Sequence, residues 1–208
     1  MPSFADSEKR LFLDVARRSL ILAVENNSVL TDLPDHASLR LPGGAFVTLR
    51  IRRRLRGCIG RLPSVVMPVS YVEAVASSAR AAALEDPRFS PVSLPELPQI
   101  DIEISLLSPL FDISPEAIVP GLHGLLVSHG PNRGVLLPQV ATEFRWPALR
   151  FLEETCVKAG LDQNAWKEPG TRTQAFTAEV FSESELVAGK SAEPANKAGS
   201  GKPYSIST

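Results

Sequence analysis

Gln99-Ile100-Asp101-Ile102-Glu103-Ile104-Ser105-Leu106-Leu107 is the stretch that decides the fold class of this chain. Aliphatic residues alternate with polar ones, which is the period of a β-strand with one buried face. The polar positions carry two carboxylates and a hydroxyl. A solvated face of an antiparallel sheet explains this pattern. Alternatively, Glu103 faces a cleft and serves as a base or a cation-binding group.

Two more strands are expected upstream of this stretch. Over residues 45–53, apolar positions alternate with polar and basic ones, so one face is predicted to join the core. The apolar positions are Val47, Leu49 and Ile51, and the polar ones are Thr48, Arg50 and Arg52. Residues 55–59 are expected to form the next strand, which leads into Gly60 and Pro63.

Arg56-Gly57-Cys58-Ile59-Gly60 places one of only two cysteines between glycines, just after a run of three arginines. Glycine suits sharp turns and close approach by another group, so Cys58 is expected at a strand end or turn. Beside cationic side chains its thiol could have a lowered pKa, which is typical of a nucleophile or a ligand-contacting thiol. Alternatively, Cys58 packs as a small hydrophobe and the glycines permit a bend. Neither a histidine nor a second cysteine lies nearby in the sequence to complete a dyad.

Three segments carry apolar residues at helical spacing. The first begins at Asp6 or Ser7, the second begins at Pro68 and ends before Asp86-Pro87, and the third covers residues 147–159 with Cys156 on its apolar face. A hairpin is expected from residues 122–128 and 133–137, followed by a last strand over residues 173–181. This order predicts an α+β fold, a mainly antiparallel sheet with about three main helices.

Composition sets broad limits on function. The chain has 208 residues, 44% of them hydrophobic, and a formal net charge of -1. That balance argues against general nucleic-acid binding and leaves a local basic site around residues 50–56 open. No cysteine or histidine spacing fits a zinc site, so no metal site is expected. Because neither a secretory signal nor a membrane-spanning run is visible, we expect a cytoplasmic protein with free thiols.

Five sequence blocks, in order, carry a family resemblance. They are Leu55-Arg56-Gly57-Cys58-Ile59-Gly60, Asp86-Pro87-Arg88-Phe89, Ile102-Glu103-Ile104-Ser105 through Ser108-Pro109, Arg133-Gly134-Val135-Leu136-Leu137-Pro138-Gln139-Val140, and Cys156-Val157-Lys158-Ala159-Gly160-Leu161 followed by Ala165-Trp166. With them the chain resembles the AMMECR domain family, whose prokaryotic members are called AmmeMemoRadiSam system protein A. The resemblance runs from about Asp6 to Phe181.

The resemblance implies one AMMECR-type domain over residues 6–185, built as two subdomains that share a core. Residues 186–208 lack apolar periodicity and are expected to be a disordered tail. The resemblance also implies neighbourhood with a Memo-type protein and a radical S-adenosylmethionine protein. It implies no settled activity, substrate or cofactor.

Two hypotheses of function follow. In the first, the protein is an enzyme or substrate-handling component in a radical-associated pathway, with Cys58 as the reactive thiol and Glu103 as a base. Arg56 would favour the thiolate or bind an anionic substrate. The remaining candidates for lining the cleft are Gly57, Gly60, Arg88, His129, Arg133 and Gln139. In the second hypothesis, the same loop and its basic neighbours form a non-catalytic module that binds a protein or a nucleic acid.

Overall fold

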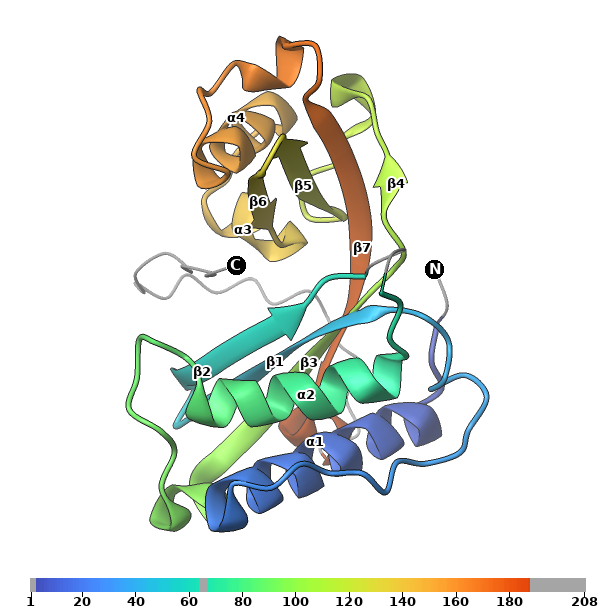
Figure 1. The fold of residues 1–208 in the computed structure, drawn as a ribbon, viewed down its shortest axis with the longest axis vertical. Helices are drawn as coiled ribbons and strands as arrows, with labels where there is room; N and C mark the ends of the chain where they lie inside the picture. The colour runs from blue at the N-terminus through green and yellow to red at the C-terminus, as the bar shows by residue number, and fades with distance from the viewer. Residues whose placement is uncertain (1–2, 64–66, 188–208) are drawn as a thin grey trace. The chain divides into compact units, whose positions relative to one another are not determined.

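A computed structural model describes residues 3–63 and 67–187 of the protein. These residues form two compact units: unit 1 comprises residues 3–63, 67–109 and 179–187, and unit 2 comprises residues 110–178. Each unit combines helices with antiparallel strands (Figure 1). The prediction of an α+β fold with antiparallel pairing is therefore confirmed.

Unit 1 is built on an antiparallel sheet with β1 at its centre. β1 (Gly44–Ile51) pairs with β2 (Arg54–Arg61) on one side and with β3 (Ile100–Leu107) on the other. Next to β3 runs β7 (Arg172–Ser182), whose last four residues belong to this unit. β2 is the edge strand. The helices α1 (Asp6–Asn26) and α2 (Tyr71–Leu84) lie together on one face of β1, β2 and β3 (Figure 1).

The helix-covered face of this sheet forms the core of unit 1. Its central strand residues are fully buried with the apolar side chains of both helices. They are Val47, Leu49, Ile102 and Ile104 from the sheet, Phe12, Val15 and Leu20 from α1, and Val72, Val75 and Ala79 from α2. The alternation read from residues 99–107 therefore gives the correct buried face. Gln99 itself ends a 3-10 turn (Leu94–Gln99), so the strand starts one residue later than expected.

Unit 2 is a smaller antiparallel assembly. β7 lies between β4 (Phe111–Asp112) and β5 (His123–His129), since Ala175 pairs with Phe111 on one side and Leu125 on the other. β5 also pairs with β6 (Asn132–Leu136), followed by α3 (Pro138–Glu143) and α4 (Ala148–Lys158). The core is made by side chains with no exposed surface, namely Leu125, Val127, Phe151, Leu152, Cys156 and Phe176. Cys156 is thus a core thiol, as its helical spacing predicts.

A short helix follows the last strand. α5 (Glu183–Val187) begins directly after β7, and Leu186 packs partly buried against the core of unit 1. Arg10 Nη2 donates a hydrogen bond of 3.0 Å to the Leu186 carbonyl oxygen. The remainder of the expected tail, residues 188–208, lies outside the described residues. Within the described chain, no helix combines the length and apolar character that crossing a bilayer requires.

Candidate functional site

Cys58 lies within β2, in a cross-strand row with two polar residues. β1 places Thr48 opposite Cys58, and β3 places Glu103 opposite Thr48. Residues directly opposite each other in a sheet share a face, so all three project away from the two helices. Thr48 Oγ1 donates a hydrogen bond of 3.3 Å to Cys58 Sγ. Cys58 and Glu103 are therefore on the same face, as the sequence argument requires, but Thr48 stands between them.

A clamp formed by Asp86 and Arg88 holds the outer edge of β2. The backbone N–H of Cys58 donates to Asp86 Oδ2 at 2.8 Å, and Arg88 Nη2 donates to the Cys58 carbonyl oxygen at 3.2 Å. Arg88 also pairs with Asp86 through its Nε at 2.9 Å and its Nη2 at 2.7 Å. An edge strand presents unpaired backbone groups. The clamp satisfies those of Cys58 in the way that a further strand would.

The environment of Cys58 disfavours a thiolate. Burial, the largest influence, raises the pKa of its thiol above the ordinary value of 9.0. The Thr48 hydrogen bond and the positive charge of Arg88 lower the pKa, whereas the negative charges of Glu103 and Asp86 add to the rise. Because burial outweighs the effect of Arg88, the direction of the pKa favours the alternative in which Cys58 packs as a small hydrophobe over the one in which its pKa is lowered. At neutral pH the sulfur carries its proton.

Arg56 lies outside this row and is bound elsewhere. The register of β2 shifts by one residue, since Leu49 faces Gly57 while Arg50 faces Leu55, which leaves Arg56 as the extra residue of a bulge. Its Nε donates to Glu96 Oε1 at 2.6 Å. Its other nitrogens donate to the carbonyl oxygens of Ser90 and Pro91 at 3.0 and 3.2 Å. The expectation that Arg56 favours the Cys58 thiolate is therefore corrected. The cation beside the Cys58 thiol is Arg88, and Arg56 is bound to Glu96.

The two glycines that flank Cys58 serve packing. A side-chain carbon on Gly57 would lie 2.2 Å from the carbonyl oxygen of Ala82 in α2, and one on Gly60 would lie 2.0 Å from the Phe46 ring. Neither glycine has a positive φ. They allow close approach of a helix backbone and of an aromatic ring, and Cys58 lies inside a strand and not at the expected turn.

Glu103 is bound by a neighbour on its own sheet face. Arg50 Nη2 donates to Glu103 Oε1 at 3.2 Å, and both side chains are one quarter exposed. This contact orients the Glu103 side chain toward Arg50.

The other three candidates belong to unit 2. His129 Nδ1 is hydrogen-bonded to Thr171 Oγ1 at 2.8 Å, at the turn between β5 and β6. Arg133 is exposed at the start of β6, beside that turn. Gln139 is exposed in the first turn of α3, beyond the opposite end of β6. Unit 2 therefore places His129 near Arg133, and Gln139 apart from both.

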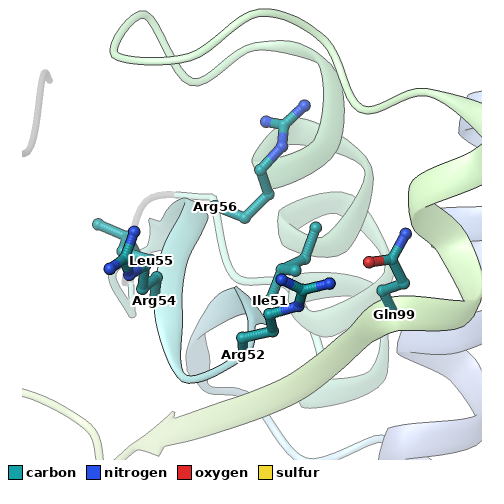
Figure 2. A pocket seen from close by; sticks show the side chains of 6 residues that line it. All are labelled: Ile51, Arg52, Arg54, Leu55, Arg56 and Gln99. Carbon is teal, nitrogen blue, oxygen red and sulfur yellow. The ribbon is translucent and has the colours of Figure 1, made fainter.

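A basic pocket at the tip of the β1–β2 hairpin is the other candidate site of unit 1. It has a volume of about 590 Å³ and is lined by Ile51, Arg52, Arg54, Leu55, Arg56 and Gln99 (Figure 2). The arginine run in the sequence indicates a local basic site. The sequence pattern did not predict that Gln99, at the end of the segment before β3, also lines it. Among the described residues, no group of three or more histidine, cysteine, aspartate or glutamate side chains is arranged to hold a metal ion.

Comparison with known proteins identifies the family. The family model described as AMMECR1 matches residues 13–181. The chain belongs to the AMMECR1 family. It is 41% identical over 186 residues to a protein from Methanothermobacter thermautotrophicus, covering 85% of this chain and 94% of that one. A protein from Thermofilum pendens is 39% identical over 201 residues, covering 88% and 93% of the two chains.

A solved crystal structure supports the same fold. The crystal structure of an uncharacterized protein from Pyrococcus horikoshii superimposes with a TM-score of 0.76 at 36% identity, covering 86% of this chain and 93% of that one. Within the AMMECR1 fold, the block that contains Cys58 and the block Asp86-Pro87-Arg88-Phe89 meet in the clamp. Asp86 and Thr48 were not among the sequence candidates. A short acidic, proline-containing motif such as that at Asp86 indicates a turn, but its partner lies 28 residues away in the sequence.

Proposed function

We propose that this AMMECR1-family protein is a non-catalytic binding module whose basic β1–β2 hairpin docks an anionic partner. The observation that carries the proposal is the state of Cys58. Its thiol is partly buried, accepts a hydrogen bond from Thr48, and has a raised pKa. A nucleophilic cysteine needs thiolate character or an adjacent base, and this one has neither among the described residues.

The surrounding charges support a scaffold role for the Cys58 row. Asp86 and Arg88 bind each other and the backbone of Cys58, while Arg50 binds Glu103. These pairs hold β2 in register. Near them, the arginines at the tip of the β1–β2 hairpin carry positive charge that is not paired with any described residue. We therefore assign a supporting role to the paired charges around Cys58, and docking to the unpaired charges of the hairpin tip.

The alkylation rate of Cys58 tests the proposal. In a Cys156→Ala background, native protein reacted with iodoacetamide across pH 6–11 should react slowly at neutral pH. The rate should rise only at alkaline pH, with an apparent pKa above that of an unfolded control. Fast reaction at pH 7 with an apparent pKa below about 8 would instead support the cysteine-enzyme hypothesis.

The family resemblance extends the proposal to partners. A Memo-type protein and a radical S-adenosylmethionine protein are the proteins we propose to share a pathway with this chain. A cytoplasmic setting, argued from its two free cysteines, belongs to the same proposal.

A further inference from the structure

The tip of the β1–β2 hairpin keeps two arginines in a backbone conformation that suits glycine. Ile51 pairs with Arg54, so Arg52 and Arg53 form a two-residue turn, with φ values of 49° and 67°. Turns of this kind favour Asn-Gly, because both central residues need positive φ. For other residues this conformation costs about 1–2 kcal/mol each. Strain that is retained in this way is a feature of functional sites.

The charges at this tip are also unbalanced. Residues 50–56 contain five arginines. Arg50 pairs with Glu103 and Arg56 pairs with Glu96. Arg52, Arg53 and Arg54 are exposed, and none of them forms an ion pair with any residue in the described part of the chain. The hairpin tip therefore carries three uncompensated positive charges.

Two of these three charged side chains line the pocket, together with apolar side chains. Arg52 and Arg54 line it together with Ile51 and Leu55, and its volume of about 590 Å³ falls in the range of small-molecule sites. In Figure 2 the Arg52 guanidinium and the Gln99 amide extend toward the same space. Gln99 Nε2 donates to the Pro95 carbonyl oxygen at 3.1 Å, which orients the amide. Figure 2 draws Arg54 and Leu55 on the other side of the β2 ribbon from Arg52 and Gln99, so cationic and apolar groups line the pocket from two sides.

We infer that this pocket binds a small organic phosphate monoester. The inference rests on the proposed binding function and names the ligand class for the hairpin. A phosphate monoester carries a charge of about −1.5 to −2 at pH 7, which matches the two unpaired guanidinium groups that line the pocket. A guanidinium binds phosphate oxygens through two parallel hydrogen bonds. Ile51 and Leu55 line the pocket from the two faces of the hairpin, and either one offers apolar surface to the organic body.

Charge balance favours a small ligand over a nucleic acid. The chain has a formal net charge of -1, and at the hairpin tip the uncompensated positive charge lies on three consecutive residues. Binding along a nucleic-acid backbone requires a longer basic stripe. Phosphate recognition at one point is the mode that this geometry fits.

Isothermal titration calorimetry with phenyl phosphate tests the inference. The full-length protein should bind this probe saturably, and Arg54→Gln and Arg52→Asn should each weaken binding by about 10-fold or more, the effect of losing a charge-assisted contact. Asparagine is chosen at residue 52 because it tolerates positive φ. Arg53→Gln is the matched control: it removes the same charge from the same turn but does not line the pocket, so its effect should stay within about 3-fold. Thermal unfolding of each variant establishes that it is folded.

Further probes separate the ways in which the inference can fail. Methyl phenyl phosphate, a diester with one negative charge, should bind about 10-fold more weakly than the monoester. No saturable binding of phenyl phosphate below about 10 mM would overturn the inference. Equal losses in all three arginine variants, or tight binding of a single-stranded oligonucleotide without binding of phenyl phosphate, would also overturn it. If the inference fails in one of these ways, slow alkylation of Cys58 at neutral pH would still support the binding module. Fast alkylation of Cys58 would remove the proposed function itself.

Discussion

Replacing Asp86 by alanine should destabilise unit 1 strongly, because this side chain is only 2% exposed and accepts hydrogen bonds from two residues. The change leaves the backbone N–H of Cys58 without its acceptor and the Arg88 guanidinium without its anion. Breaking a buried ion pair from one side costs about 3–5 kcal/mol. Arg88 is 24% exposed and regains some water, which places the expected loss of unfolding free energy at about 2–4 kcal/mol.

Urea denaturation with a double-mutant cycle measures this contribution. Asp86→Ala, Arg88→Ala and the double variant should give a coupling energy of at least about 1 kcal/mol, because each single change leaves the other charge without its partner. Asp112→Ala is the matched control. Its carboxylate makes a similar two-point pair with Arg172, but both side chains are more than 60% exposed, so no measurable change is expected. A loss below about 1 kcal/mol for Asp86→Ala would refute the argument that the clamp holds β2.

The clamp should also give a pH signature. Burial alone would raise the pKa of Asp86, but hydrogen bonds from the Arg88 side chain and from the backbone N–H groups of Cys58 and Arg88 outweigh it and lower the pKa below 3.8. The stabilisation is therefore complete above the ordinary value and is lost as the pH falls through the folded-state pKa. Asp86→Ala should reduce the acid dependence of stability in that range.

Three further changes test other parts of the structure. Gly57→Ala should lower the free energy of unfolding by about 1–3 kcal/mol, because its added carbon meets the Ala82 carbonyl oxygen and backbone must move; an unchanged urea midpoint would contradict this packing. Hydrogen bonds from Arg56, the largest cause, and from Ser93 lower the pKa of Glu96 from 4.5 to about 2, so Glu96→Gln should flatten the fall in stability between those pH values; an unchanged acid-denaturation profile would show that these contacts contribute nothing. Cys156→Ala should cost on the order of 1 kcal/mol in urea unfolding, and native-state alkylation should spare this buried thiol; rapid labelling would place it outside the core.

Local sequence patterns were sufficient for the main elements of the fold. The alternation in β3 gives its buried face, and the apolar spacing of α1 and α4 gives their positions. α2 starts at Tyr71 and not at Pro68, because Ser70 and Glu73 form its capping box. The two-residue β4 and the short α3 and α5 were not predicted, since segments of that length hold too few residues for a periodicity to be visible.

The sequence by itself determined the α+β class, the family and the face of β3 on which Glu103 lies, because side-chain periodicity and short motifs are local properties. Only the tertiary structure decided the chemistry around Cys58. Its pKa depends on burial and on Asp86 and Arg88, which come from a turn 28 and 30 residues further along the chain. Arg56 is directed to Glu96 by a bulge that no local pattern reveals. The course of the backbone through space decides which charged side chains lie close together. For that reason, spacing in the sequence indicated Arg56 and not Arg88 as the cation beside the thiol.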